Sequence, residues 1–197
     1  MYKNLIFDVG GVLLSYRWEY AMAEAGLTIE RATKLFHKMM ADPLWAQLDL
    51  AIRPFDEVVE DFCRMFPEEA GPIRHFFSHP ENMPIDRPAV WEEIRRLKDK
   101  GYRIYLLSNY AEGLFRVHTE GKPFREYTDG ELVSYMVHLI KPDPAFYLEL
   151  LSRFGLDPKE SLFFDDREEN TAAARDCGID SVTVESEEML IGELKKL

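Results

Sequence analysis

The sequence predicts an α/β fold in which a parallel sheet is flanked by helices and a helical segment is inserted near the N-terminus. Three observations predict it. Residues 5–14 form an apolar run containing two adjacent glycines, and residues 15–86 carry apolar side chains at helical spacing. From Arg87 onward, apolar runs alternate with amphipathic stretches, which is the pattern of parallel strands joined by helical crossovers.

The first apolar run places a carboxylate at the end of a strand. Asp8 interrupts the run, so we expect it where the strand leaves the sheet. Ligands of parallel α/β proteins bind in the crevice outside the carboxyl ends of the strands. Gly10 and Gly11 allow the backbone to turn tightly and to approach a ligand closely. The alternative is that Asp8 only opens a turn after the strand.

The inserted segment, residues 15–86, is expected to form several short helices. Its apolar stripes are typical of the inner faces of amphipathic helices. Tyr16, Trp18 and Trp45 could stack on a sugar, but aromatic side chains in a small helical domain are more often core residues, so the predicted site omits them. Breaks between the helices are expected at Asp42-Pro43, Arg53-Pro54, Pro67, Gly71-Pro72 and His79-Pro80.

The elements after Arg87 follow from the same patterns. The first predicted helix is closed by Gly101, and a later one begins after Asp143, which can cap it, with Pro144 at the first helical position. In chain order, the sequence predicts a helix over residues 88–100, a strand over 103–107, a helix from 144 to about 155, a strand over 162–164, a helix over 170–177, a strand over 181–184 and a helix over 187–196.

Three of the predicted strands end in polar residues. Asp8 follows the first strand, Ser108 and Asn109 follow the second, and Asp165 and Asp166 follow a third. Each of these by itself is typical of a turn or a helix cap. Because the carboxyl ends of parallel strands meet at one edge of a sheet, the three together predict a single site there.

Composition and charge bound the classes of function. The chain of 197 residues suffices for one domain with a small insert, and its net charge of -12 argues against nucleic acid or an anionic membrane as a partner. The two cysteines are far apart, no signal-peptide pattern opens the chain and no apolar stretch reaches membrane-spanning length. A cytoplasmic location is therefore expected, and the oligomeric state is not readable from the sequence.

Four segments of the sequence resemble the successive signature motifs of the haloacid dehalogenase-like hydrolase superfamily, in the order of that family. They are residues 7–12 (FDVGGV), 107–109 (LSN), 140–144 (IKPDP) and 164–166 (FDD), with Asn170 downstream. The resemblance implies a Rossmann-like hydrolase core formed by residues 1–14 and 87–197, and a small α-helical cap domain formed by residues 15–86. Within the superfamily, the pattern is most similar to sugar-phosphate phosphatases related to alpha-D-glucose-1-phosphate phosphatase.

The resemblance implies a magnesium-dependent phosphatase. A phosphate monoester carries anionic oxygens, so a carboxylate nucleophile needs a cation and several donors beside it. Asp8 would attack phosphorus, form an aspartyl-phosphate and share the metal. Asp166, with Asp165 acting through water, would supply further carboxylates to Mg²⁺, and the backbone carbonyl of Gly10 would complete the protein ligands.

The same resemblance assigns the phosphate-binding groups. Ser108 and the backbone amide of Asn109 would donate to the phosphoryl oxygens, and Lys141 would neutralise the growing charge. Lys141 precedes Pro142, which favours an extended backbone, so its side chain can be directed back toward the strand ends. The expected substrate is a small phosphorylated metabolite, most simply a sugar phosphate.

One position departs from the family pattern. Most phosphatases of the superfamily place a second Asp two residues after the nucleophile as the general acid, and here that residue is Gly10. This favours substrates whose leaving groups depart readily, such as sugar 1-phosphates or acyl phosphates. It also leaves two alternatives open, namely a metal-independent haloacid dehalogenase-type hydrolase and a non-catalytic protein that binds a phosphorylated ligand.

Overall fold

A computed structural model describes all residues, 1–197. The strands are β1 Asn4–Phe7, β2 Leu14–Tyr16, β3 Pro84–Asp86, β4 Arg103–Ser108, β5 Gly130–Val133, β6 Ser161–Asp165 and β7 Asp180–Thr183. The α-helices are α1 Trp18–Ala23, α2 Ile29–Ala41, α3 Pro43–Leu50, α4 Phe55–Met65, α5 Ala70–Ser78, α6 Pro88–Asp99, α7 Glu112–Thr119, α8 Ser134–Val137, α9 Pro144–Phe154, α10 Glu168–Asp176 and α11 Glu187–Lys195. The 3₁₀ helices are η1 Pro67–Glu69, η2 Pro80–Asn82, η3 Pro123–Tyr127 and η4 Pro158–Glu160.

The predicted parallel α/β sheet is confirmed. It has five strands in the order β5-β4-β1-β6-β7, and every neighbouring pair is parallel. The central strand β1 is buried along its whole length, as the apolar run predicts. At its carboxyl end, Phe7 is paired with Leu106 of β4 and with Phe164 of β6. The polar residues that follow these strands therefore lie at one edge of the sheet.

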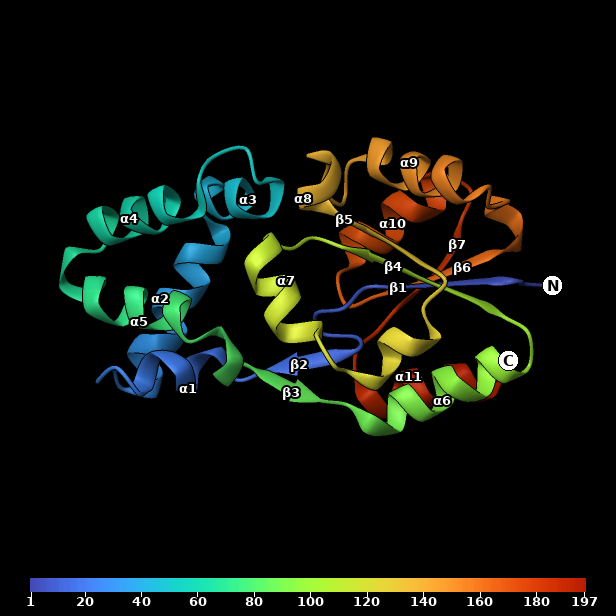
Figure 1. The fold of residues 1–197 in the computed structure, drawn as a ribbon, viewed down its shortest axis with the longest axis horizontal. Helices are drawn as coiled ribbons and strands as arrows, with labels where there is room; N and C mark the ends of the chain where they lie inside the picture. Colours follow the sequence, from blue (N-terminus) through green and yellow to red (C-terminus); the bar gives the residue numbers. More distant parts are fainter.

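Helices cover both faces of the sheet (Figure 1). Alternate residues of β1 point to opposite faces. Leu5 and Phe7 pack in a large core cluster that includes Ile94 of α6 and Leu190 of α11. Ile6 packs in a second cluster whose members come from α9 and α10 as well as the sheet, among them Phe146, Leu150 and Ala174. The sheet is thus the middle layer of three.

The segment between β2 and β3 contains only helices and their connections. Figure 1 shows α1 to α5 as a group beside the sheet, joined to it by the β2–β3 ribbon. The two strands of this ribbon are antiparallel, and Leu14 pairs with Asp86 at its end nearest the core. The interior of the group is aromatic, with Phe36 packed edge-on against both Trp45 and Phe76.

One expected helix break is wrong. Gly71-Pro72 does not interrupt the chain, because α5 already begins at Ala70 and Pro72 is its third residue. The first-turn amides of a helix have no acceptor within the helix, so a proline there removes no hydrogen bond. The break expected at Asp42-Pro43 is confirmed, since the Asp42 side chain accepts a hydrogen bond from the Leu44 amide (2.9 Å) and caps α3.

Several short elements of the structure were not predicted from the sequence. Strand β5 extends the sheet beside β4, but only its last two residues are buried, so its periodicity is too short to recognise. The ribbon strands β2 and β3 have three residues each, and helix α7 falls in a stretch for which the sequence analysis names no element. No helix is both long enough and apolar enough to cross a membrane.

Candidate active site

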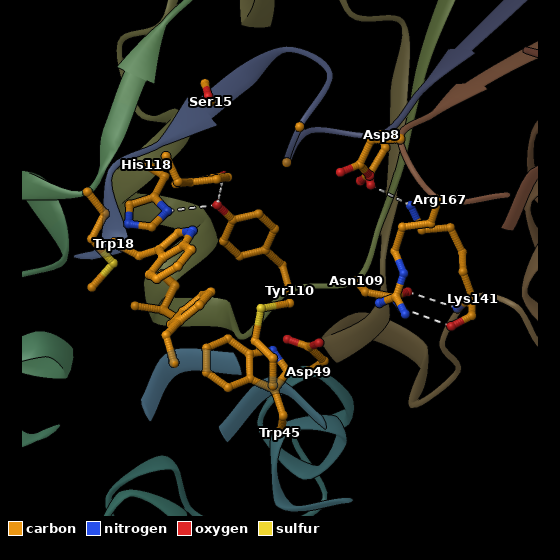
Figure 2. A pocket seen from close by; sticks show the side chains of 18 of the residues that line it. Asp8, Ser15, Trp18, Trp45, Asp49, Asn109, Tyr110, His118, Lys141 and Arg167 are labelled. Atoms are coloured by element: carbon orange, nitrogen blue, oxygen red, sulfur yellow. Dashed lines mark hydrogen bonds and ion pairs between the residues drawn. The ribbon is translucent and has the colours of Figure 1, made fainter. Parts of the chain in front are cut away.

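A cavity of about 400 Å³ lies at the carboxyl ends of β1, β4 and β6. Its floor comes from the sheet side, and its opposite wall comes from helices α1, α2, α3 and α5 of the inserted segment. The sheet side contributes Asp8, Gly10, Gly11, Asn109, Lys141 and Asp166, and the helical side contributes Trp18, Phe36, Met40, Trp45, Asp49 and Phe76. Figure 2 shows several of these side chains directed into the cavity.

Asp8 follows the last residue of β1, and both of its carboxylate oxygens have partners. Oδ1 accepts hydrogen bonds from the Val9 amide (2.7 Å) and from the Ser108 hydroxyl (2.6 Å). Oδ2 lies 2.9 Å from the Lys141 ammonium. The Asp8 side chain is almost buried, with 8% of the residue exposed. Ser108, the last residue of β4, therefore directs its hydroxyl at Asp8 rather than into the open cavity.

Lys141 is held from two sides. Its buried ammonium lies 2.6 Å from Asp165 Oδ2 and so bridges Asp165 and Asp8. Its backbone is locked to Asn109, whose side chain donates to the Lys141 carbonyl (2.9 Å) and accepts from the Lys141 amide (2.8 Å). Burial favours the neutral amine, but the two carboxylates outweigh it and raise the pKa of Lys141, so the group is charged at neutral pH.

The adjacent carboxylates Asp165 and Asp166 have different surroundings. Asp165 is fully buried, and besides Lys141 it accepts from the Arg167 amide and from the Asn170 side chain, each at 2.9 Å. Asp166 is exposed toward the cavity and accepts no hydrogen bond from another side chain. Gly11 has φ +71°, and a Cβ atom there would overlap the Asp166 carboxylate. Asp165 thus anchors Lys141, and Asp166 faces the cavity.

Asp8, Asp165 and Asp166 fit a divalent cation. Each offers one oxygen, and these oxygens all lie within 4.8 Å of one another. Burial raises the pKa of Asp8 to about 7 even with Lys141 beside it, and burial with the charge of Asp165 raises that of Asp166. One ammonium does not balance three carboxylates, so the cluster favours a further positive charge. Hard oxygen donors of this kind are the ligands that Mg²⁺ prefers.

The turn that follows Asp8 is fixed by the start of helix α6 and by Arg87, the residue before it. Arg87 donates to the carbonyl oxygens of Gly11 (2.5 Å) and Val12 (3.1 Å), and the Trp91 indole donates to that of Leu13 (2.8 Å). These hydrogen bonds hold a glycine turn that would otherwise have wide conformational freedom. The approach of the backbone to the cavity is therefore set by packing against α6.

The cavity is also lined by three aromatic residues that were not predicted to belong to the site. Tyr16, Trp18 and Trp45 are partly buried and pack against the main core cluster, as predicted, and they also line the cavity. Sequence periodicity cannot distinguish an aromatic side chain that packs in a core from one that faces a cavity, because both occupy the inner face of a helix or strand. Arg17 is exposed, and its side chain donates to the Asn82 carbonyl (3.0 Å).

A hydrogen-bonded chain of side chains crosses one wall of the cavity. His118 Nε2 lies 2.9 Å from the Pro80 carbonyl oxygen and must donate to it, so Nδ1 accepts from the Tyr110 hydroxyl at 2.7 Å. The Tyr110 oxygen is then left to accept from the Tyr16 hydroxyl. Burial lowers the pKa of His118 to about 4, which keeps its ring neutral at neutral pH.

Asp49 is a further cavity residue that sequence reasoning missed. It lies near the end of α3, and no side chain or amide donates to its carboxylate, while its backbone carbonyl accepts from Ser134 (2.6 Å). Burial raises the pKa of Asp49 to about 7. A signal was present in the sequence, since Asp49 is the one charged residue of an otherwise mostly apolar helix.

The chain matches a known family over most of its length. The family described as haloacid dehalogenase-like hydrolase matches residues 2–178. The chain is 27% identical to acyl-CoA dehydrogenase family member 10 of Mus musculus, over 100% of this chain and 19% of that protein. It is 26% identical to D-ribitol-5-phosphate phosphatase of Bacteroides thetaiotaomicron, over 94% of this chain and 93% of that protein. The chain thus spans about a fifth of the first relative and nearly all of the second.

Solved structures share the fold. A HAD family enzyme of Bacteroides thetaiotaomicron, solved as a magnesium complex, matches with a TM-score of 0.74 and 23% identity over 93% of each chain. A dehalogenase structure matches with a TM-score of 0.73 and 21% identity, over 93% of this chain and 84% of that one. At these identities the likeness establishes the fold. The same fold occurs in the HAD family enzyme that was solved with magnesium and in the dehalogenase.

Proposed function

Because the chain belongs to the haloacid dehalogenase-like hydrolase family, we propose that it is a Mg²⁺-dependent phosphatase acting on a small phosphorylated metabolite. One observation carries this proposal. Asp8 lies at the cavity with its carboxylate oriented by Ser108 and Lys141 and with the free carboxylate of Asp166 beside it. A dehalogenase needs no such second carboxylate, whereas a metal-assisted phosphatase does.

The residues support a reaction in two displacements. An oxygen of Asp8 attacks phosphorus, the bond from phosphorus to the leaving oxygen breaks, and an aspartyl-phosphate forms on Asp8. Lys141, fixed by Asp165, stays charged and offsets the negative charge at the phosphoryl oxygens. Water then attacks the aspartyl-phosphate, which releases phosphate and regenerates Asp8. Ser108 keeps the Asp8 carboxylate in one orientation through both steps.

The proposed ligands of the metal are two carboxylates and one backbone carbonyl at the cavity. Asp8, Asp166 and the backbone carbonyl of Gly10 would hold Mg²⁺, with Asp165 acting through water. A bound Mg²⁺ offsets the charge of the substrate phosphate. The Asn109 backbone amide, at the cavity, would donate to a phosphoryl oxygen.

We propose residues 15–86 as a cap domain over a hydrolase core of residues 1–14 and 87–197. The β2–β3 ribbon joins the two, with Leu14 paired to Asp86 where the chain leaves and re-enters the core. Because helices from this segment form one wall of the cavity, opening at the ribbon would admit substrate and closing would exclude water.

The proposed substrate is a sugar phosphate. Trp18 and Trp45 offer flat apolar faces at the cavity, which suit the carbon-bound hydrogens of a sugar. A sugar 1-phosphate is the form favoured by the absence of a carboxylate at Gly10, because the anomeric oxygen of a sugar leaves phosphorus more readily than the oxygen of a simple alcohol does. Fastest turnover of sugar 6-phosphates and glycerol phosphate in a substrate panel would contradict this preference.

The function is tested with a panel of phosphosugars and p-nitrophenyl phosphate, with a chelator and then with added Mg²⁺. We expect turnover to be lost with chelator and restored by Mg²⁺, and the Asp8→Asn variant to lose it entirely. Metal-independent release of halide from a 2-haloacid would instead support the dehalogenase alternative. Phosphosugar binding with no turnover of p-nitrophenyl phosphate would support a non-catalytic binding protein.

A further inference from the structure

The place next to Asp8 that would suit a second carboxylate is filled by another side chain. A Cβ atom added at Gly10 would lie 3.3 Å from Cε2 and 3.8 Å from the hydroxyl oxygen of Tyr16. A contact of 3.3 Å leaves no room for a longer side chain to extend in that direction unless Tyr16 moves. Any group that exchanges a proton with the leaving oxygen must therefore come from elsewhere on the cavity wall.

The tyrosines and the histidine on that wall are unsuited to give a proton. The chain of donors runs from Tyr16 to Tyr110 and ends at His118 Nδ1, so each hydroxyl hydrogen is directed away from the open cavity. The remaining His118 hydrogen is on Nε2 and is donated to the Pro80 carbonyl. Burial also raises the pKa of Tyr16 and Tyr110, which makes both hydroxyls weaker acids.

The charged side chains of the sheet side are also engaged. Lys141 is bound between Asp8 and Asp165, and Arg167 pairs with Glu169 at 2.5 Å. Asp166 belongs to the carboxylate cluster that fits a metal. Among the titratable side chains that line the cavity, Asp49 is the one with neither a bonded partner nor a place in that cluster.

Asp49 is held in position by contacts between α3 and the core. The Ser134 hydroxyl lies 2.6 Å from the Asp49 carbonyl oxygen and accepts from the Tyr110 amide at 2.9 Å. His138 Nδ1 lies 2.6 Å from the Leu50 carbonyl oxygen, one residue further along. The end of α3 is therefore fixed against the sheet side, and Figure 2 shows Asp49 on the opposite side of the cavity from Asp8.

We propose that Asp49 is the general acid and base of this site, a conclusion that rests on the proposed phosphatase function. In the first step, the carboxyl group of Asp49 gives its proton to the leaving oxygen as the bond to phosphorus breaks and the bond from Asp8 forms. The products are a neutral alcohol, the aspartyl-phosphate and the Asp49 carboxylate. In the second step, that carboxylate takes a proton from the attacking water, and hydrogen phosphate leaves as both aspartates return to their starting forms.

The surroundings of Asp49 suit this exchange. Burial is the largest influence and raises its pKa to about 7, and the negative charge of Asp8 raises it further, whereas Lys141 and Arg167 act in the opposite direction. Tyr110 and His118, which face the same cavity, are neutral at neutral pH. A general acid with a pKa near the operating pH is populated in both of the forms that the two steps need.

The test compares two leaving groups by rapid mixing at saturating Mg²⁺. p-Nitrophenyl phosphate has a leaving group that needs no proton, whereas the sugar phosphate that the wild-type protein turns over fastest has a leaving oxygen that does. For Asp49→Asn we expect a burst of one nitrophenol per protein at close to the wild-type rate, followed by slow steady turnover. With that sugar phosphate we expect the first step itself to slow by roughly 10²–10⁴-fold. The matched control is Asp56→Asn, the same change at an exposed residue of α4 outside the cavity.

Each outcome of this test either supports or overturns the proposed role of Asp49. Equal slowing of the first step with both substrates, or an unchanged rate with the sugar phosphate, overturns the role of Asp49. Asp49→Glu keeps the carboxyl group and is expected to retain turnover within about tenfold, so it separates loss of the acid from loss of folding. If the wild-type protein turns over no sugar phosphate of the panel, the proposed function itself fails, and the role of Asp49 fails with it.

Discussion

Replacing Asp8 with Asn is expected to stabilise the metal-free protein while abolishing turnover. The pKa of Asp8 is about 7 in the folded chain against an ordinary 3.8, because burial outweighs the attraction of Lys141. At about 1.4 kcal/mol per unit of pKa, keeping this carboxylate ionised lowers the free energy of unfolding by about 4 kcal/mol above neutral pH. Asn has nearly the same shape and carries no charge, so the variant avoids this cost.

The difference between the two proteins should depend on pH. The folded protein binds the Asp8 proton more tightly than the unfolded chain does, so the stability that this proton gives is complete below about pH 4. It is lost as the pH rises through about 7. The variant has no such proton, so its advantage should grow from near zero at about pH 4 to its full size at about pH 8. For a chain of this length, about 4 kcal/mol corresponds to roughly 8–16 °C in Tm.

The assay is thermal and urea unfolding of both proteins in chelator at several pH values. A variant that is no more stable than wild type at about pH 8 would refute the reasoning, because it would mean that keeping the buried Asp8 carboxylate ionised does not destabilise the folded protein. Asp56→Asn serves as the control and should change stability by less than about 0.5 kcal/mol, as expected for an exposed position. Added Mg²⁺ should stabilise wild type more than the variant and so narrow the difference.

Two further substitutions test the rest of the carboxylate cluster. Lys141→Met removes a buried cation that bridges Asp8 and Asp165, and we expect urea unfolding in chelator to show a loss of about 3–5 kcal/mol; a loss below about 1 kcal/mol would contradict the bridging role. Gly11→Ala introduces a Cβ that overlaps the Asp166 carboxylate, so the Mg²⁺ concentration for half-maximal activity should rise by about tenfold or more. Gly26→Ala, also at positive φ but in open space, should lose stability without this change in Mg²⁺ requirement.

The sequence predicted the charged residues at the strand ends better than it predicted the residues that form the opposite wall of the cavity. Asp8, Lys141 and Asp166 come from motifs with fixed spacing after buried strands, and the structure brings them together at one edge of the sheet. The different surroundings of Asp165 and Asp166 were only partly foreseen. Asp165 and Asp166 are the same residue type, so the sequence does not indicate which of them contacts Lys141. That depends on the direction in which each side chain points at the end of β6.

The sequence alone determined the α/β class, the parallel sheet and the carboxylates at its edge, because strand periodicity and strand-end motifs are local properties of the chain. The tertiary structure alone decided that Tyr16 fills the space beside Gly10 and that Asp49 faces the cavity. Both residues belong to the segment between the first and second motifs, and the position of that segment over the sheet is set by long-range contacts such as the hydrogen bond from Ser134 to Asp49. Local patterns carry no information about such contacts, so packing had to decide them.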